Sequence, residues 1–123
     1  MKICTGIDLI EIKRIETSIA RHGERFLARI FTPDERLSCA GKVESLAARF
    51  AAKEAVAKAL GSGLDGFGFL DIEVTRAKNG APGLELYGVA AQKAREQGLT
   101  RWSISLSHSQ SHATAIAIGY SEQ

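Results

Sequence analysis

Several residue types that define whole classes of protein are scarce in this chain of 123 residues. It has two cysteines, two prolines and one tryptophan, and its apolar runs all fall short of the about 18 residues that a membrane span needs. Cys4 and Cys39 lack metal-ligand spacing, so we interpret them as thiols in a reducing compartment. With neither a disulfide framework, a membrane span nor a signal-peptide core in the pattern, we expect a cytoplasmic protein that binds no membrane.

An excess of one charge sign is also missing. Sixteen basic and fourteen acidic residues give a net charge of +2, which favours no class of partner. The distribution is less even, because five basic and only two acidic residues lie between Lys13 and Arg29. With 45% hydrophobic and 24% charged residues, the composition is typical of one folded domain, which we expect to span residues 1–123.

The first half of the chain predicts a strand followed by helices. Residues 2–12 are rich in isoleucine and predict a buried strand that runs into a helix ending at Gly23. A short helical piece follows, and Thr32 with the proline after it predicts the start of another helix. The alanine-rich segment 44–60 is the strongest helix prediction, with Gly61 as its stop.

The second half predicts mainly strands. Residues 69–88 alternate in polarity on both sides of Asn79-Gly80, which is typical of a hairpin. A short helix at 89–98 and two strands within 102–118 follow. We therefore expect a small single-domain α+β fold, with a mostly antiparallel sheet packed against the long alanine-rich helix.

Asp8 stands between apolar residues of the first predicted strand. Burial of an unpaired carboxylate there costs several kcal/mol, so this side chain needs a partner. The sequence leaves two partners open, a basic neighbour such as Arg14 or a metal ion.

The alanine-rich helix carries four charged residues that bear on function. Glu54 and Lys58 share a face and form either an exposed ion pair or part of a site. Arg49 and Lys53 are a like-charged pair at the same spacing, which is unfavourable unless an anion lies between them. A polyphosphate could approach such a helix of small side chains closely, although solvated helix faces carry the same pattern.

Residues 61–68 hold four of the twelve glycines. The segment follows a helix C-terminus, where the dipole disfavours anions, so it is not a P-loop and a phosphate there needs a cation such as Lys58. It is either a connector or a place where the backbone approaches a ligand closely. His108 alternates with Ser105 and Ser107 on a strand, without the nucleophile elbow of a serine hydrolase.

The basic stretch places Arg14, Arg21 and Arg25 at spacings of seven and four residues. They line one helix face if the helix continues past Gly23. That face is either solvated or a docking surface for an acidic partner.

Four segments together resemble one family. In the order and at about the spacing of the holo-acyl-carrier-protein synthases, the chain contains "GIDLIEIKRIE", "FTPDE", "ARFAAKEAVAKALGSG" and "SISLSHSQSHATAIA". These are the small, bacterial-type phosphopantetheinyl transferases, and the resemblance covers essentially the whole chain. The run at 50–61, paired with Gly6-x-Asp8, is the most specific part of it.

This resemblance implies an activity and an assembly. The 4′-phosphopantetheine arm of coenzyme A is transferred to a serine of apo acyl carrier protein, with release of adenosine 3′,5′-bisphosphate, as a step that serves fatty acid biosynthesis. It also implies a homotrimer whose sites lie at the subunit interfaces.

The resemblance further implies roles for residues on the catalytic side. Mg²⁺ is expected to bind Asp8 and Glu54, since this ion prefers oxygen ligands and keeps several waters. Lys58 is expected on the pyrophosphate, where it stabilises charge on the leaving group. Glu54 or a metal-bound water takes the serine proton, and the sequence leaves this choice open.

For the nucleotide and the partner, the resemblance implies a second set of residues. The coenzyme A ligands expected in this way are Arg49, Lys53, Gly61, Gly63 and His108. The arginines of the basic stretch are expected to meet an acidic helix of the carrier protein and to set the association rate.

Two other classes of protein fit the sequence less well than an enzyme does. A nucleic-acid-binding domain that uses the basic first helix needs exposed aromatics among its basic residues, but aromatics are only 7% of the chain and most lie in apolar stretches. A non-catalytic trimeric scaffold leaves Glu54 and Lys58 without a purpose. We therefore expect an enzyme that binds no nucleic acid.

Overall fold

The order of elements agrees with the sequence-based prediction. The computed structural model describes residues 1–61 and 68–122. Strand β1 (Ile3–Glu11) leads into helices α1 (Ile12–His22), α2 (Glu24–Ile30), α3 (Pro33–Cys39) and α4 (Val43–Ala59). The 3-10 turn η1 (Phe69–Asp71), strands β2 (Ile72–Arg76) and β3 (Pro82–Leu86), helix α5 (Gly88–Glu96) and strands β4 (Arg101–His108) and β5 (His112–Tyr120) follow.

The strands form two antiparallel sheets. The main sheet has the order β1-β5-β4, so the two ends of the chain pair with each other, Ile3 opposite Tyr120 and Glu11 opposite His112. Strands β2 and β3 form a separate hairpin. Its turn follows the prediction from Asn79-Gly80, because the Asn79 side chain accepts a hydrogen bond from the Ala81 amide and Gly80 has a φ of +87°.

Two helix boundaries follow from local chemistry. Gly23 separates α1 from α2 with a φ of +52°, a backbone conformation that side chains disfavour. Thr32 opens α3 with a capping box, in which its hydroxyl accepts from the Glu35 amide at 3.2 Å and the Glu35 carboxylate accepts from the Thr32 amide at 2.9 Å. Both boundaries were predicted, but the reciprocal Glu35 contact was not.

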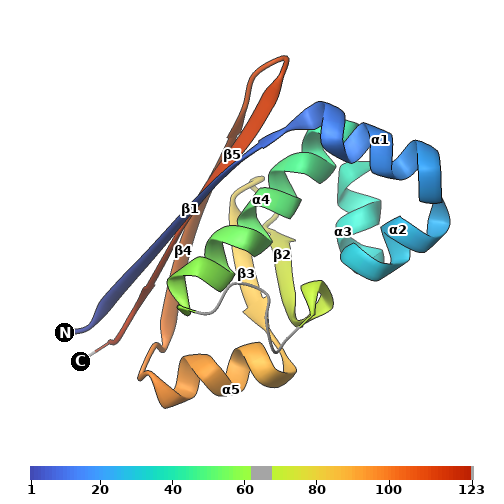
Figure 1. Cartoon of the computed structure of the whole chain (residues 1–123). Helices are drawn as coiled ribbons and strands as arrows, with labels where there is room; N and C mark the ends of the chain where they lie inside the picture. Colours follow the sequence, from blue (N-terminus) through green and yellow to red (C-terminus); the bar gives the residue numbers. More distant parts are fainter. Residues whose placement is uncertain (62–67, 123) are drawn as a thin grey trace.

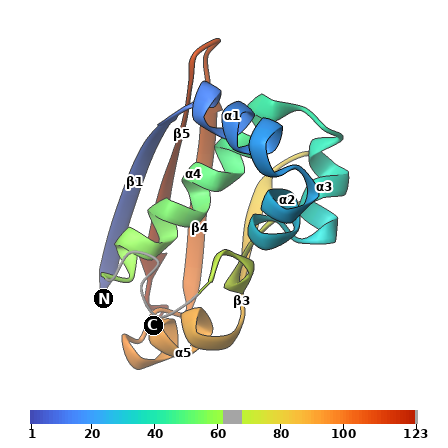
Figure 2. The same cartoon turned by 45° about the vertical axis from the view of Figure 1, so that its right-hand side comes forward.

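Helix α4 is the centre of the molecule and lies across one face of the main sheet (Figure 1). Helices α1, α2 and α3 and the β2-β3 hairpin cover its other sides, as the second view shows (Figure 2). Its alanines, with Ala51, Ala52 and Ala55 fully buried, allow the sheet to come close. The alanine-rich composition therefore serves packing on several sides at once.

The far face of the main sheet carries apolar side chains that this chain leaves exposed. The large ones are Ile3, Ile7, Leu9 and Ile116, between 39% and 67% exposed. Ile7 pairs with Ile116 across β1 and β5, so these residues form a continuous surface, here called the outer sheet face. A surface of this kind marks an interaction site.

None of the helices that the structure describes is long and apolar enough to cross a membrane.

Candidate active site

Asp8 and Lys58 form the nucleus of the site. Asp8 lies on the side of β1 that faces α4, and its Oδ1 is 2.9 Å from Lys58 Nζ, which also donates to the Ile7 carbonyl at 3.1 Å. The Asp8 side chain is 16% exposed and that of Lys58 is 51% exposed. Of the partners that the sequence left open, the structure thus shows a basic one, but it is Lys58 rather than Arg14.

Glu54 is the second carboxylate of the site. Burial raises its pKa, the nearby Asp8 charge raises it further, and Lys58 and Arg14 oppose this by lowering it. Two carboxylates and two cations from β1, α1 and α4 therefore act on one another. Strand β1 and helix α4 thus bring Asp8, Glu54 and Lys58 to one place in the fold.

Gly6 sets how closely β1 approaches α4. A Cβ added at this position would lie 1.8 Å from the Ala55 carbonyl oxygen and 2.8 Å from the Ala59 nitrogen, both of which are backbone atoms. Only glycine fits this crossing. Because Asp8 follows two residues later on the same side of the strand, the contact at Gly6 brings its carboxylate to the Glu54 and Lys58 face of the helix.

A hollow of about 260 Å³ is lined by two arginines, a serine and apolar residues of several elements, and Arg14 is one of the arginines. We call it the Phe50–Phe69 hollow, after two rings that stack with their centroids 5.1 Å apart. The other lining residues are Ile15, Ser18, Phe26, Arg29 and Ile30. Arg14 links it to the carboxylates, since its charge acts on Glu54. Phe50 also precedes Glu54 by one turn of α4, so the hollow adjoins the Glu54 side of the site.

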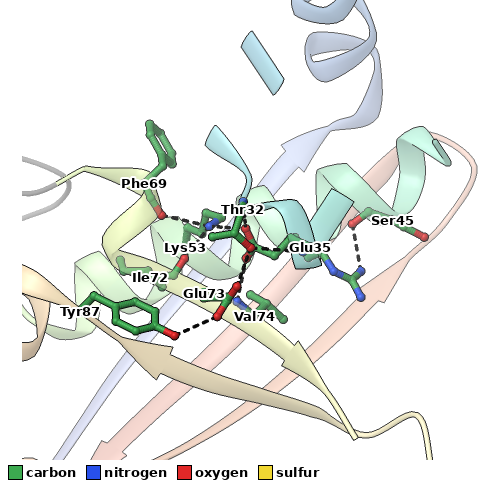
Figure 3. A network of polar contacts seen from close by, with 10 residues as sticks. Thr32, Glu35, Ser45, Lys53, Phe69, Ile72, Glu73, Val74 and Tyr87 are labelled. Atoms are coloured by element: carbon green, nitrogen blue, oxygen red, sulfur yellow. Dashed lines mark hydrogen bonds and ion pairs between the residues drawn. The ribbon is translucent and has the colours of Figure 1, made fainter. Parts of the chain in front are cut away.

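Lys53 does not lie at this site, although the sequence analysis assigned it to a phosphate of the nucleotide. Its side chain is fully buried, and Nζ is 2.8 Å from the Glu35 carboxylate (Figure 3). Burial lowers the pKa of Lys53, while the Glu35 charge raises it. The assignment is wrong for this structure, because the ammonium has no exposed surface and already has an anionic partner.

Arg49 opens to a different cavity on another side of α4. This cavity, of about 250 Å³, lies between the β2-β3 hairpin and β4, and is also lined by Thr75, Arg76 and Ser105. The guanidinium is almost fully buried, donates to the Ser45 carbonyl at 3.3 Å, and has a buried Nε without a hydrogen-bond partner among the described residues. Arg49 is thus suited to bind an anion, but not beside Asp8 of its own chain.

The remaining candidate residues lie at the surface. His108 is exposed at the end of β4, two strands away from β1. Arg21 is exposed in the last turn of α1, and Arg25 is exposed on α2, beyond the break at Gly23. Gly61 ends α4 in the left-handed region, with a φ of +88°. Gly63 falls within 62–67, outside the described residues.

Sequence reasoning missed two features. Glu35 is fully buried and holds Lys53, and its only sequence signal was its place three residues after the capping residue Thr32. Phe50 and Phe69 belong to separate segments, so their stacking had no local signal. None of these three residues was named as a candidate in the sequence analysis.

The chemistry of the donor set limits which ion the site could hold. No group of three or more histidine, cysteine or acidic side chains with metal-ligand geometry occurs within residues 1–61 and 68–122. Two carboxylates suit Mg²⁺, which takes oxygen ligands and completes its shell with water and substrate phosphates. The residues present therefore fit this ion, but not a closed structural metal site.

An acidic pair with a lysine, beside a basic helix, is an arrangement that suits a phosphorylated substrate. The chain belongs to the 4′-phosphopantetheinyl transferase superfamily, whose model matches residues 4–117. The holo-[acyl-carrier-protein] synthase of Moorella thermoacetica is 52% identical to it, over 92% of this chain and 90% of the relative. That of Herpetosiphon aurantiacus is 48% identical, over 95% and 98%.

Solved structures agree with this assignment. The crystal structure of Helicobacter pylori holo-[acyl-carrier-protein] synthase in complex with coenzyme A is similar with a TM-score of 0.86 at 34% identity, covering 94% of this chain and 99% of that one. The structure of the synthase from Neisseria meningitidis gives 0.84 at 38% identity, over 95% and 97%. The fold is that of the family along nearly its whole length.

Proposed function

We propose that this protein is a holo-[acyl-carrier-protein] synthase. It transfers the 4′-phosphopantetheine arm of coenzyme A to a serine of apo acyl carrier protein and releases adenosine 3′,5′-bisphosphate. The observation that carries the proposal is the meeting of Asp8, Glu54 and Lys58 in a chain about half identical to synthases that it matches end to end. The setting is cytoplasmic fatty acid biosynthesis.

Asp8 and Glu54 are the residues that would hold Mg²⁺. When bound, the ion neutralises charge on the pyrophosphate of coenzyme A. The Asp8 charge raises the pKa of Glu54, and β1 crosses α4 closely at Gly6, which supports this assignment.

Lys58 is assigned to the leaving phosphate, and Glu54 is assigned to the proton of the carrier serine. Lys58 stands half-exposed beside Asp8, so its ammonium can turn to a bound pyrophosphate and stabilise the leaving phosphate. Glu54, with a raised pKa, is suited to accept the proton of the carrier serine. A water held by Glu54 is the alternative acceptor.

Arg49 and His108 are assigned to the nucleotide from a neighbouring subunit. Arg49 has a buried, unpartnered Nε and opens to a cavity that shares no lining residue with the Asp8 cluster. We assign both places to one coenzyme A molecule held between two copies of the chain, as the resemblance implies. Gly61 and Gly63 are assigned to the approach of the backbone to this ligand, the latter from sequence alone.

The outer sheet face is assigned to the homotrimer. Its isoleucine and leucine side chains are exposed in one chain, and their burial against other copies stabilises the assembly by about 25 cal/mol per Å² of apolar surface. An Ile7→Asp variant should elute as a monomer in light-scattering chromatography and lose transfer, whereas the exposed Leu37→Asp, on α3, should remain a trimer. A trimeric Ile7→Asp protein would remove this face from the interface.

A transfer assay tests the function and its dependence on metal. The protein is incubated with coenzyme A and apo carrier protein, and the carrier's mass is followed. We expect a gain of one phosphopantetheine arm with Mg²⁺, loss of transfer with EDTA, and recovery with Mg²⁺ or Mn²⁺. Titration calorimetry of Mg²⁺ in the presence of coenzyme A should show binding that Glu54→Gln weakens. Absence of a mass gain with every metal would contradict the proposal.

The basic residues of α1 and α2 are assigned to the carrier protein. Arg21→Glu should raise the KM for carrier protein by about tenfold, because it reverses a charge on the docking surface, and leave the KM for coenzyme A unchanged. Lys93→Glu, on the distant helix α5, is the matched control with the same charge change. A changed affinity for coenzyme A would show that Arg21 serves the nucleotide instead. Arg14 is unsuited to this test because its charge also acts on Glu54.

A further inference from the structure

The ion pair between Lys53 and Glu35 lies outside the residues assigned so far. Both side chains have no exposed surface. Lys53 Nζ has three hydrogens, and the structure supplies three acceptors, namely Glu35 Oε1 at 2.8 Å, the Phe69 carbonyl at 3.0 Å and the Ile72 carbonyl. All three hydrogens of the ammonium therefore have acceptors within the protein.

Glu35 completes the network from the other side. Its Oε1 also accepts from the Thr32 amide at 2.9 Å, and its Oε2 accepts from the Val74 amide at 2.7 Å. Glu73, which projects from β2 between these contacts, accepts from the Thr32 hydroxyl at 2.6 Å and from the Tyr87 hydroxyl at 3.1 Å. Figure 3 shows these side chains converging where α3, α4 and β2 meet.

The ion pair takes the place of a strand beside β2. In an antiparallel hairpin, the residues whose backbone groups point to the partner strand alternate along each strand. The Tyr87 amide donates to the Asp71 carbonyl and the Ala77 amide to the Ala81 carbonyl, so the carbonyl of Ile72 and the amide of Val74 point to the edge away from β3. A further strand would pair with these two groups, and here Lys53 binds the carbonyl while Glu35 binds the amide. Two side chains from helices thus anchor the edge of the hairpin.

The third acceptor of Lys53 connects the pair with the candidate active site. The Phe69 carbonyl belongs to η1, and the Phe69 ring stacks on Phe50 to form a wall of the Phe50–Phe69 hollow. Arg14 also lines the hollow, and its charge acts on Glu54. A chain of direct contacts therefore runs from Glu35 through Lys53 and Phe69 to the hollow.

We propose that Lys53 and Glu35 are positioning residues, which hold Phe69 against Phe50 and so shape the hollow that receives the acceptor protein beside Glu54. The hollow is lined by residues of α1 and α2, the helices that carry the carrier-facing arginines. The acceptor, rather than coenzyme A, is for this reason the substrate whose binding depends on the pair. This inference rests on the proposed function.

Stability alone does not account for such a pair. Removal of both charges in favour of neutral residues of similar volume is often neutral or even stabilising. An apolar pair, however, cannot bind the Phe69 carbonyl. The charged pair thus provides two features that an apolar pair lacks, the anchors on the edge of β2 and the fixed position of η1.

The test uses the double variant Lys53→Met/Glu35→Gln in the full-length protein. Changing one partner alone would leave a buried charge unpaired and lower the free energy of unfolding for an unrelated reason. The glutamine oxygen still accepts from the Val74 amide, so the edge of β2 keeps one anchor. The contacts that are lost are those from Nζ to Glu35 and to the Ile72 and Phe69 carbonyls, and of these only the last reaches η1.

Two readouts are expected to change together. The KM for apo carrier protein should rise about tenfold, while that for coenzyme A stays within about twofold. NOEs between the Phe50 and Phe69 rings should be present in the wild type and weakened in the double variant. The second readout needs no activity, so it decides the positioning role even if the wild type transfers nothing, a result that would overturn the proposed function alone.

A double-mutant cycle distinguishes a positioning role from a general loss of stability. Phe69→Leu should raise the KM for carrier protein by itself, and adding it to the double variant should give no further rise, since both act on one contact. Leu99→Ala, which removes a buried side chain near α5, is the control for lost stability and should leave both KM values unchanged. Additive effects, or ring NOEs that persist in the double variant, would overturn the positioning role.

Should the double variant fail to fold, Glu35→Gln alone takes its place. Its amide nitrogen faces the ammonium and pushes it away from the Phe69 carbonyl, so the NOEs and the KM for carrier protein should change in the same directions. Unchanged values of both in a folded Glu35→Gln protein would also overturn the proposal.

Discussion

Asp8→Asn and Glu54→Gln should each reduce transfer of phosphopantetheine by at least about a hundredfold under saturating Mg²⁺. Each variant keeps the shape of the side chain and removes the negative charge that would hold the ion. Glu54→Gln also removes the carboxylate that we propose accepts the serine proton. The measurement is the initial rate of carrier mass gain, compared at several concentrations of Mg²⁺.

The fold should survive both substitutions. Lys58 is half-exposed, and an ion pair in such a position adds only about 0 to 1 kcal/mol, so loss of the contact with Asp8 costs little stability. Glu122→Gln is the matched control, because it removes an equally simple ion pair, with Arg101, far from the site. Near-wild-type rates for Asp8→Asn or Glu54→Gln would exclude that residue as a metal ligand.

Gly6→Ala should destabilise the protein more than a methyl group added at any other glycine that the structure describes. The new Cβ would lie 1.8 Å from the Ala55 carbonyl, an atom that cannot move without displacing α4. Overpacking of this kind costs about 1–3 kcal/mol or more, and here it also pushes Asp8 away from Glu54. We expect a clear drop in Tm together with loss of transfer.

The reason for this effect can be checked with two further variants. Gly83→Ala, also in a strand, brings its Cβ to 2.6 Å from the Thr75 hydroxyl, which is the end of a side chain and can rotate, so its Tm should change much less. Ala55→Gly should not rescue Gly6→Ala, because the clash is with the backbone. Rescue would show that side-chain crowding, rather than the distance between strand and helix, limits this position.

Local patterns in the sequence predicted most of the secondary structure. The capping residue Thr32, the turn at Asn79-Gly80 and the stop at Gly23 depend on neighbours within a few positions, so they could be predicted without a fold. The division of the strands into a three-stranded sheet and a hairpin could not, because pairing between the two ends of the chain has no local signal. The fold class was therefore predicted, and the sheet topology was not.

The residues of α4 show the same limit at the site. Arg49, Lys53, Glu54 and Lys58 looked equally available, because a helix rich in alanine has no polar face from which to tell its exposed side. In the structure the Lys53 side chain is fully buried and forms an ion pair with Glu35, while Lys58 forms an ion pair with Asp8. Arg49 opens to a cavity elsewhere. Which charge meets which partner depends on the elements that pack over each side of the helix.

The sequence alone determined the helix that carries the charges, through its local composition, and the family, through the resemblance of four segments. It assigned the two acidic residues to the site only through that resemblance. Only the tertiary structure decided that one lysine of that helix is buried and another faces Asp8, and that Gly6 marks the closest crossing. The physical reason is that burial and charge pairing are set by segments distant in the chain, whose contacts leave no periodic trace in the sequence.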